Sequence, residues 1–530
     1  MQRQTGVDLV AVRHSSAETS VATMTSRSRV LQAVAESPLE LQSIVAALAA
    51  QYAVTTGVKQ LVRRRRLDTF DQRLHAAGLT LEHQIVASGD RLVLGRRDGS
   101  STVSVPLKDR QWPALADVLP SGPVREAVAP VAGIRALMVS ADEMRRLRWV
   151  ELRNEDGKIV VRVELDEPAS AAATPARVTV RALRGYDDQA RRADRLLVGV
   201  GLRAVENPEN VEDRGLSSAS PTAGTSRAMP ARVLLATALS DSLLAVRENL
   251  PGLLDDVDTE FLHDFRVAVR RTRATLKMGR PTLPDVMRHS WEPAFKWLGD
   301  ITTPLRDLDV YLLDLPVMRT WLVTANPTDL EPLATHLRSR RAVERRTLVR
   351  RLRSARFRRL DREWGEELSR LVDTLDDAHG EGFSAGQLID RSLSRAYRRV
   401  ARGGAIIGAD SPGGDLHELR KRCKELRYAL EVFAPVIDSA DGKRAVEDLK
   451  ALQDVLGRFQ DSEAQRMAMR GFAEQMMIEG TTAGAMLAMG ELIGHLDVEQ
   501  DRARREFGAS FARFERPSNT KLMHRLGGGT

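Results

Sequence analysis

The sequence contains two segments in which a histidine is followed by basic residues at the same spacing. In the first, HDFRVAVRRTR, positions 0, +3, +7 and +10 are His263, Arg266, Arg270 and Arg273. In the second, HELRKRCKELR, the same positions are His417, Arg420, Lys424 and Arg427. We call these sets the first and second basic ladders. Imidazole, guanidinium and ammonium groups donate hydrogen bonds to phosphate oxygens, so both ladders are candidate anion-binding sites.

The spacing of each ladder matches one face of an α-helix. At about 100° per residue, the four positions fall within an arc of roughly 80°. Lys277 extends the first ladder, whereas the equivalent residue in the second segment is Glu431. An apolar stripe accompanies each ladder, formed by Leu262, Phe265, Val269 and Leu276 in the first and by Leu416, Leu419, Cys423 and Leu430 in the second. Each helix is therefore predicted to bury one face and to hold its ladder along the margin of the core.

An offset of 154 residues relates the two segments, and the same offset relates four further identical pairs. Lys296, Leu298, Asp300 and Asp307 correspond to Lys450, Leu452, Asp454 and Asp461. These identities predict a duplicated helical unit. A basic helix face is often merely solvated, but solvation does not require a histidine at the same place twice. We therefore expect the two ladders to share one anion-binding groove.

A further concentration of positive charge lies at residues 338–359, which contain eleven arginines and one acidic residue, Glu344. Two interpretations remain open. The arginines could form a solvated helix surface, or they could extend a track for a polyanion.

The second half of the chain shows helical periodicity throughout and predicts an all-α domain at residues 230–516. Helices are expected at residues 233–250, 260–278, 291–300, 329–360, 361–376, 387–401, 416–433, 443–456, 461–479 and 481–514. We expect breaks at Pro251-Gly252, Pro281, Pro304, Gly380 and residues 411–414, because proline and glycine interrupt helices.

The first half has a mixed pattern, and we assign residues 30–205 to an α+β domain. A helix is expected at residues 39–51, and strands at residues 84–87, 91–94, 101–105, 149–153, 159–165 and 177–183. Turn signals such as Asp98-Gly99 and Asp156-Gly157 suggest hairpins in an antiparallel sheet. We predict a disordered tail at residues 1–29, a linker at 206–229 and a C-terminal tail at 517–530.

Composition limits the classes of protein that fit. The chain has 530 residues, a formal net charge of +8 and one cysteine, Cys423, which excludes intramolecular disulfides and zinc sites made of several cysteines. The absence of a long apolar run predicts no transmembrane helix, and we expect a cytoplasmic protein. The sequence contains no recognisable nucleotide-loop, zinc-protease or hydrolase motif, so we predict no cofactor, metal or catalytic residue.

The helical half resembles the CHAD family, the conserved histidine α-helical domain. The resemblance rests on both ladder segments, on PLRDLDV after the first and on LQDVLGRFQD after the second. It implies two pseudo-symmetric four-helix bundles whose basic faces line a groove, inorganic polyphosphate as the partner, and association with polyphosphate granules. The implied binding residues are His263, Arg266, Arg270, Arg273, Lys277, His417, Arg420, Lys424 and Arg427.

The first half more weakly resembles a CYTH domain, an antiparallel β-barrel-like triphosphate tunnel. The resemblance lies in the segment from Arg66 to Leu79 and in the strand pairs that follow. The family's alternating acidic residues are missing; where they should occur near the end of the domain, the sequence reads VTVR. Because Mg²⁺ requires such carboxylates, we expect a degenerate, non-catalytic domain. Four acids remain, and we assign them to turns and the surface: Asp68, Asp71, Glu164 and Asp166.

Two other functions stay open at this stage. The first half could be a Mg²⁺-dependent triphosphatase, although its acidic strand set looks absent. The chain could also be a nucleic-acid-binding or regulatory scaffold, although aromatic residues for base stacking are few, at 4%. The sequence leaves the oligomeric state open.

Overall fold

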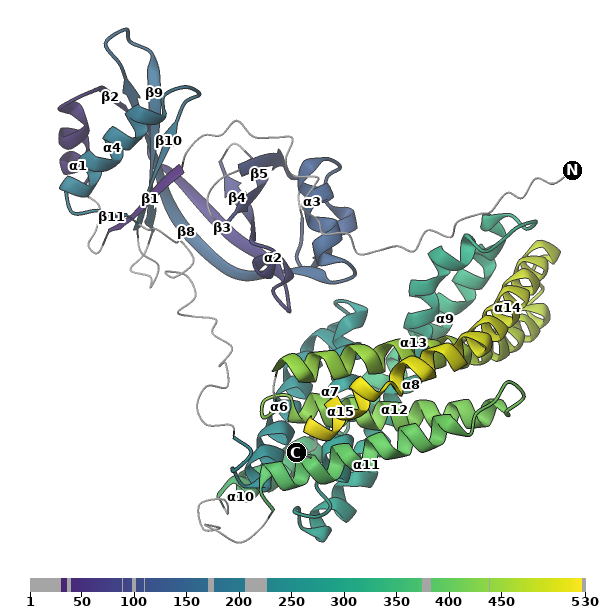
Figure 1. The fold of residues 1–530 in the computed structure, drawn as a ribbon. Helices are drawn as coiled ribbons and strands as arrows, with labels where there is room; N and C mark the ends of the chain where they lie inside the picture. Colours follow the sequence, from purple (N-terminus) through teal and green to yellow (C-terminus); the bar gives the residue numbers. More distant parts are fainter. Residues whose placement is uncertain are drawn as a thin grey trace, which may run out of the picture. The chain divides into compact units, whose positions relative to one another are not determined.

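A computed structural model describes residues 30–35, 40–87, 89–97, 102–108, 110–169, 176–204, 226–373, 383–437 and 439–526. The chain divides into two compact units, Met1–Ser220 and Pro221–Thr530, and each is described here by itself (Figure 1). The predicted tail at residues 1–29 lies outside the described residues. Among the described residues, no helix has a stretch long and apolar enough to cross a membrane.

The N-terminal unit is built on one antiparallel sheet with the strand order β11-β1-β10-β9-β8-β3-β4-β5-β6. The strands are β1 (Val30–Ala35), β2 (Ala53–Thr56), β3 (Gln60–Thr69), β4 (Leu79–Val86), β5 (Gly89–Arg96), β6 (Thr102–Pro106), β7 (Ala114–Leu115), β8 (Ala136–Arg153), β9 (Ile159–Pro168), β10 (Ala176–Ala182) and β11 (Arg203–Ala204). The long strand β8 pairs with β9 along one half and with β3 along the other, so it joins the two ends of the sheet (Figure 1).

Four helices cover this sheet in two places. One core packs α1 (Leu41–Ala49) and α4 (Asp187–Gly199) against β8, β9 and β10. A second core packs α2 (Arg73–Ala76) and α3 (Pro123–Ala132) against β3, β4 and β5. The sheet therefore has a separate apolar core at each end, and the α+β assignment is confirmed.

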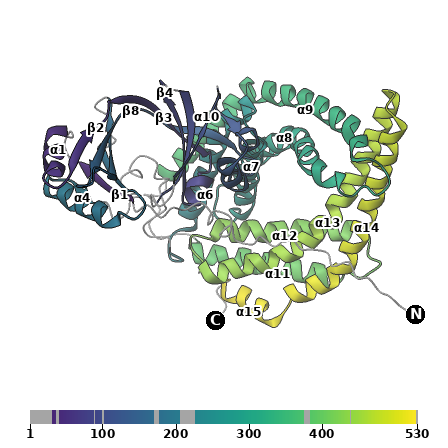
Figure 2. The same ribbon diagram turned by 90° about the horizontal axis from the view of Figure 1, so that it is seen from above.

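The C-terminal unit is all-α, as predicted. Its helices are α6 (Ala231–Asp255), α7 (Thr259–Met278), α8 (Asp285–Arg319), α9 (Glu331–Leu352), α10 (Ala355–Asp373), α11 (Ala385–Ala405), α12 (Gly413–Phe433), α13 (Ser439–Ile478), α14 (Ala483–Phe514) and α15 (Pro517–Leu526). Figure 2 shows α8 next to α9 and α13 next to α14, and both pairs are in contact.

The duplication is visible in the helix boundaries. α6 and α11, α7 and α12, and α8 and α13 each begin 154 residues apart. α9 and α14 complete the pattern with starts 152 residues apart, at Glu331 and Ala483. The unit thus contains two four-helix repeats, α6–α9 and α11–α14, and α10 and α15 lie outside them. The ends of α8, α9, α13 and α14 share one apolar core, in which Leu315 and Leu333 of the first repeat meet Phe472 and Leu492 of the second.

Several predicted helix breaks are wrong. Pro251 lies inside α6, and Pro304 lies inside α8 together with two further prolines. Each proline removes one backbone hydrogen bond, but Pro251 and Pro304 lie on exposed helix faces, and burial of neighbouring residues such as Leu253 and Leu305 keeps each helix continuous. The two helices expected between residues 443 and 479 are one helix, α13, and α15 was missed. α15 packs against α11 and α13 and buries Leu522, Met523 and Leu526.

Glycines in the helical unit make a matched pair for testing the packing. A Cβ atom at Gly404 of α11 would meet the Phe511 ring at 1.9 Å, whereas a Cβ at Gly490 of α14 meets nothing within 4 Å. We expect Gly404→Ala to lower the free energy of unfolding by about 1–3 kcal/mol through overpacking. Gly490→Ala should raise it by up to about 1 kcal/mol through helix propensity. Urea unfolding followed by circular dichroism measures both changes, and equal effects would contradict the described packing of α11 on α14.

Candidate functional site

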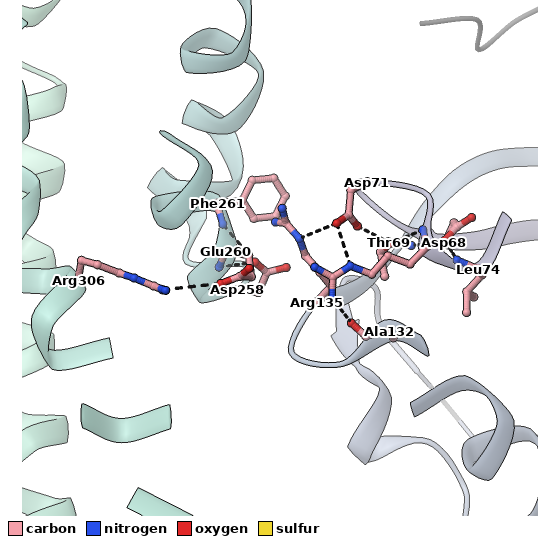
Figure 3. Close-up of polar contacts among 11 residues, drawn as sticks. Asp68, Thr69, Asp71, Leu74, Ala132, Arg135, Asp258, Glu260, Phe261 and Arg306 are labelled. Atoms are coloured by element: carbon pink, nitrogen blue, oxygen red, sulfur yellow. Dashed lines mark hydrogen bonds and ion pairs between the residues drawn. The ribbon is translucent and has the colours of Figure 1, made fainter. Parts of the chain in front are cut away.

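Helix α7 carries the first ladder and begins at a well-defined cap. The Asp258 carboxylate accepts hydrogen bonds from the backbone N–H groups of Glu260 and Phe261, at 2.9 and 3.3 Å (Figure 3). Phe261 and Phe265 are buried, and this apolar face fixes the rotation of the helix. The ladder consequently lies at the margin of the core, as the spacing predicted, with His263, Arg266 and Arg270 half-buried and Arg273 and Lys277 exposed.

Helix α12 carries the second ladder and packs directly against α7. It buries Leu419 and Cys423, so its ladder also lies beside the core. An ion pair between Lys277 of α7 and Glu425 of α12 ties the two helices, and Arg399 of α11 binds the other oxygen of Glu425 at 2.6 Å. The structure therefore brings the two ladders onto contacting helices. We call the nine predicted binding residues together the ladder surface.

Equivalent positions of the two repeats meet at this contact. Arg270 and Lys424 occupy the same place in their ladders, and Arg270 acts electrostatically on Lys424. Burial, followed by Arg420 and Arg270, lowers the pKa of the Lys424 ammonium from 10.5 to about 8. The like charges at the centre of the ladder surface are therefore only weakly compensated by protein groups.

The arginines at position +3 of both ladders are anchored on the helix that follows. Arg266 donates to the Gly299 carbonyl and to the hydroxyls of Thr302 and Thr303 on α8. Its counterpart Arg420 forms an ion pair of 2.8 Å with Asp461 on α13. The equivalent acid of the first repeat, Asp307, acts electrostatically on Arg266, so the same pair of positions interacts in both repeats.

The two ladder histidines have different surroundings. His263 is half-buried, and burial, followed by the positive charge of Arg306, lowers its pKa below the usual value. His417 is exposed, and its Nδ1 lies 2.6 Å from Oε1 of Gln460. Arg306 and Gln460 are themselves related by the 154-residue offset, so the neighbour of each histidine comes from the same position in its repeat. We did not predict these two neighbours from the sequence. Applying the 154-residue offset to non-identical residues would have identified Arg306 and Gln460 as equivalent positions.

The ladder residues differ in whether the protein already satisfies them. Lys277, Arg420 and Arg427 are paired with carboxylates. In the part of the chain that the structure describes, Arg270, Arg273 and Lys424 have no ion-pair partner, and Nε of Arg270 is buried without a hydrogen bond. These three cations therefore remain available to an external anion.

In the basic block at residues 338–359, the part-buried arginines Arg341 and Arg345 form ion pairs within the protein. Arg341 bonds to Asp309 and Asp256 at 2.6 and 2.7 Å, and Arg345 lies 3.2 Å from Asp256. Others, including Arg350 and Arg358, are exposed. The interpretation as a solvated face thus holds for only part of the block, and part of it is structural.

The N-terminal sheet encloses a cavity of about 640 Å³, whose polar lining comes from residues of seven strands, β3, β4, β5, β6, β8, β9 and β10. Its charged lining residues are Arg64, Arg66, Asp68, Glu82, Arg91, Arg96, Arg97, Glu164, Asp166, Arg177 and Arg181. Strand β10 contributes Arg177, Thr179 and Arg181, so no carboxylate alternates along it. Strand β1 has the sequence VLQAVA and carries no charged residue.

The four remaining acids divide into two groups. Asp68 accepts hydrogen bonds from the backbone N–H groups of Thr69, Leu74 and His75, and Asp71 binds Arg73 at 2.8 Å, so both stabilise a turn as predicted (Figure 3).

The prediction was wrong for Glu164 and Asp166, which line the cavity instead of the outer surface. The alternation along β9 explains the error, because the buried apolar residues Val163 and Leu165 pack into the core and turn the acids to the opposite face.

These acids do not fit a Mg²⁺ ion. Asp166 is held between Arg145 at 2.7 Å and Arg64 at 2.8 Å, and Glu82 lies 3.2 Å from Arg64. Burial raises the pKa of Glu164, which disfavours the charged form that a metal requires. Among the described residues there is no group of three metal-ligating side chains. The metal implied by a triphosphate tunnel therefore lacks a ligand set in this part of the chain.

Comparison with known families decides the assignment of the helical unit. Residues 237–470 match the family model of the CHAD domain. The helical unit contains a CHAD domain. The matched residues include both ladders, so the resemblance inferred from the two histidine segments is confirmed. No curated protein matches the chain.

Solved structures that resemble the chain fall into two groups. The CHAD domain of the plant Ricinus communis is 20% identical, with a TM-score of 0.46, over 55% of this chain and 94% of that one. PptA from Streptomyces chartreusis is 18% identical, with a TM-score of 0.40, over 53% and 99%. A Hippeastrum protein described as a candidate adenylyl cyclase with a dominant triphosphatase activity is 14% identical, with a TM-score of 0.26, over 34% and 91%.

Burial of Lys424 in the CHAD domain predicts a pH-dependent stability. Its folded-state pKa of about 8 lies below the usual 10.5, so the unfolded chain binds more protons between these values and stability rises with pH across that window. Lys424→Met should be more stable than the wild type near pH 7, and this advantage should shrink near pH 10. The exposed neighbour Lys421→Met is the matched control. Urea unfolding at both pH values measures the difference in unfolding free energy between each variant and the wild type. If this difference is the same at pH 7 and pH 10 for Lys424→Met, the burial described is contradicted.

Proposed function

We propose that the CHAD domain binds inorganic polyphosphate on the ladder surface. The observation that carries this proposal is the set of three cations without an ion-pair partner, Arg270, Arg273 and Lys424, on two helices in contact. Like charges held close together are unfavourable in the free protein. An anion that lies across them relieves this repulsion and gains charge-assisted hydrogen bonds.

The chemistry of polyphosphate suits this surface. The ladders present cations at successive turns of each helix, whereas a compact anion could reach only a few of them at once. A flexible polyanion can engage cations of both helices and release its condensed counterions as it binds. The neutral form of His263, favoured by its lowered pKa, can still donate one N–H hydrogen bond to a phosphate oxygen.

The proposed binding also suggests where the protein is located in the cell and that it acts without a cofactor. A chain that binds long polyphosphate would collect where that polymer accumulates, so we place the protein in the cytoplasm and on polyphosphate granules. The proposed binding needs no metal or cofactor, because the protein supplies all of the positive charge.

Two alternatives are less well supported. A triphosphatase in the N-terminal unit would require free carboxylates for a metal, but Asp166 and Glu82 are occupied by arginines. A nucleic-acid-binding role would favour aromatic side chains beside the cations, and the ladder segments themselves contain only Phe265.

The three free cations provide the direct test. We expect the Arg270→Ala, Arg273→Ala, Lys424→Ala triple variant to bind long polyphosphate at least about tenfold more weakly than the wild type. The slope of log affinity against log salt should fall by about 2, since fewer phosphates are neutralised. Titration calorimetry of the full chain at several salt concentrations measures both quantities.

Matched controls separate this effect from a general loss of charge. The Arg470→Ala, Arg505→Ala, Arg513→Ala variant removes three exposed cations from α13 and α14 and should bind nearly as well as the wild type. Equal weakening in both variants would mean that binding follows net charge alone. Displacement of polyphosphate by an equal phosphate concentration of single-stranded RNA would favour the nucleic-acid alternative.

A further inference from the structure

Lys424 differs from the other lysines of the chain in its surroundings. All ten lysines lie in the described residues, and nine of them are exposed, whereas Lys424 is half-buried. The lysines near it are bound by carboxylates, because Lys277 pairs with Glu425 and Lys421 pairs with Glu418. No carboxylate binds Lys424 in the part of the chain that the structure describes. Its amine is therefore neither fully hydrated nor held by an acid.

Charged groups of three helices face this amine. Arg420 and Arg427 lie one turn before and one turn after it on α12, while Arg270 acts on it from α7 and Asp461 from α13. The only acid among them, Asp461, is already paired with Arg420. Burial, followed by Arg420 and Arg270, lowers the pKa of the ammonium to about 8, so about half of the amine is uncharged at pH 8. An uncharged amine beside a cationic group is a nucleophile.

We propose that Lys424 is an acylation site for acyl phosphates, in which Arg270 holds the phosphate group next to the amine. Arg270 has no ion-pair partner in the described residues, and its buried Nε makes no hydrogen bond. A guanidinium group donates such bonds to phosphate oxygens. The cations that disfavour a proton on the amine also attract an anionic donor, so the same surroundings favour both the nucleophile and its substrate.

The reaction needs only the amine and the acyl phosphate. The amine nitrogen attacks the carbonyl carbon of the donor, and a C–N bond forms. The C–O bond to the phosphate breaks, and the phosphate leaves with the proton that the amine loses. The product is an uncharged amide, so acylation removes one of the three free cations of the ladder surface. This consequence for polyphosphate binding rests on the proposed function, whereas the reaction at Lys424 does not.

The test treats the full chain with acetyl phosphate at pH 8, in the absence of polyphosphate, and follows each lysine by peptide mass spectrometry. We expect Lys424 to be acetylated at least about tenfold faster than Lys421, whose amine is exposed and paired with an acid. Inorganic phosphate should slow the reaction selectively at Lys424, because it competes for Arg270. Equal rates at the two lysines, or a lack of protection by phosphate, would overturn the proposal.

A neutral acyl donor, the N-hydroxysuccinimide ester of acetic acid, separates recognition of the phosphate from reactivity of the amine. Arg270→Ala should slow acetylation of Lys424 by acetyl phosphate at least about fivefold more than acetylation by the neutral ester. Arg505→Ala removes an exposed arginine of α14 and is the matched control, which should leave the ratio of the two rates unchanged. A ratio that Arg270→Ala also leaves unchanged would contradict the assignment of Arg270.

Two further comparisons keep the result unambiguous. If Arg270→Ala has an altered circular dichroism spectrum, the protection of wild-type Lys424 by inorganic phosphate decides. A chain that is acetylated selectively at Lys424 but does not bind polyphosphate would support this inference and overturn the proposed function alone. A chain that binds polyphosphate without selective acetylation would overturn this inference alone.

Discussion

The CHAD domain depends on the burial of one apolar face on each of two contacting helices, α7 and α12, because this burial leaves their cationic margins near each other. α7 and α12 each bury a stripe of large side chains, among them Phe265 and Leu419, and the two helices pack against each other. Burial of these stripes fixes the rotation of each helix and therefore the position of its ladder. Glu425 and Asp461 neutralise some of the resulting charge, but the central pair, Arg270 and Lys424, has no carboxylate bound to it in the described structure. Hydrophobic burial thus offsets an electrostatic cost that a bound anion would remove.

Duplication explains why α7 and α12 carry equivalent ladder residues. Divergence of the two repeats after the duplication explains why these residues have different neighbours. The neighbour of the ladder histidine is Arg306 in the first repeat and Gln460 in the second. The residue at the end of the ladder is Lys277 in one and Glu431 in the other. Each difference moves positive charge toward the first repeat. Glu431 also binds Arg427 of the second ladder, so two of the three free cations, Arg270 and Arg273, lie on α7. We therefore expect α7 to contribute more of the phosphate contacts.

Sequence periodicity predicted the helices and the ladder faces, because the spacing of apolar residues in one segment determines which face of that helix is buried. It could not predict which helices touch, so the ion pair of Lys277 with Glu425 and the anchoring of Arg266 on α8 came only from the structure. Strand β3 was missed because its run of four arginines hides the alternation: Arg64 and Arg66 face the cavity, while Arg63 and Arg65 bind Asp142. Glu164 and Asp166 were assigned to the surface because a sequence shows that residues alternate but not which face encloses a cavity.

The most direct test of the account is the stoichiometry of long polyphosphate on chains that lack two cations of one ladder. One variant carries Arg270→Ala and Arg273→Ala, and the other carries Lys424→Ala and Arg427→Ala. If the ladders act as one surface, analytical ultracentrifugation with titration calorimetry will show that each variant loses most of its affinity and that neither retains a wild-type site. If each variant instead keeps one full-affinity site at half the wild-type stoichiometry, the ladders bind independently and the central claim is contradicted.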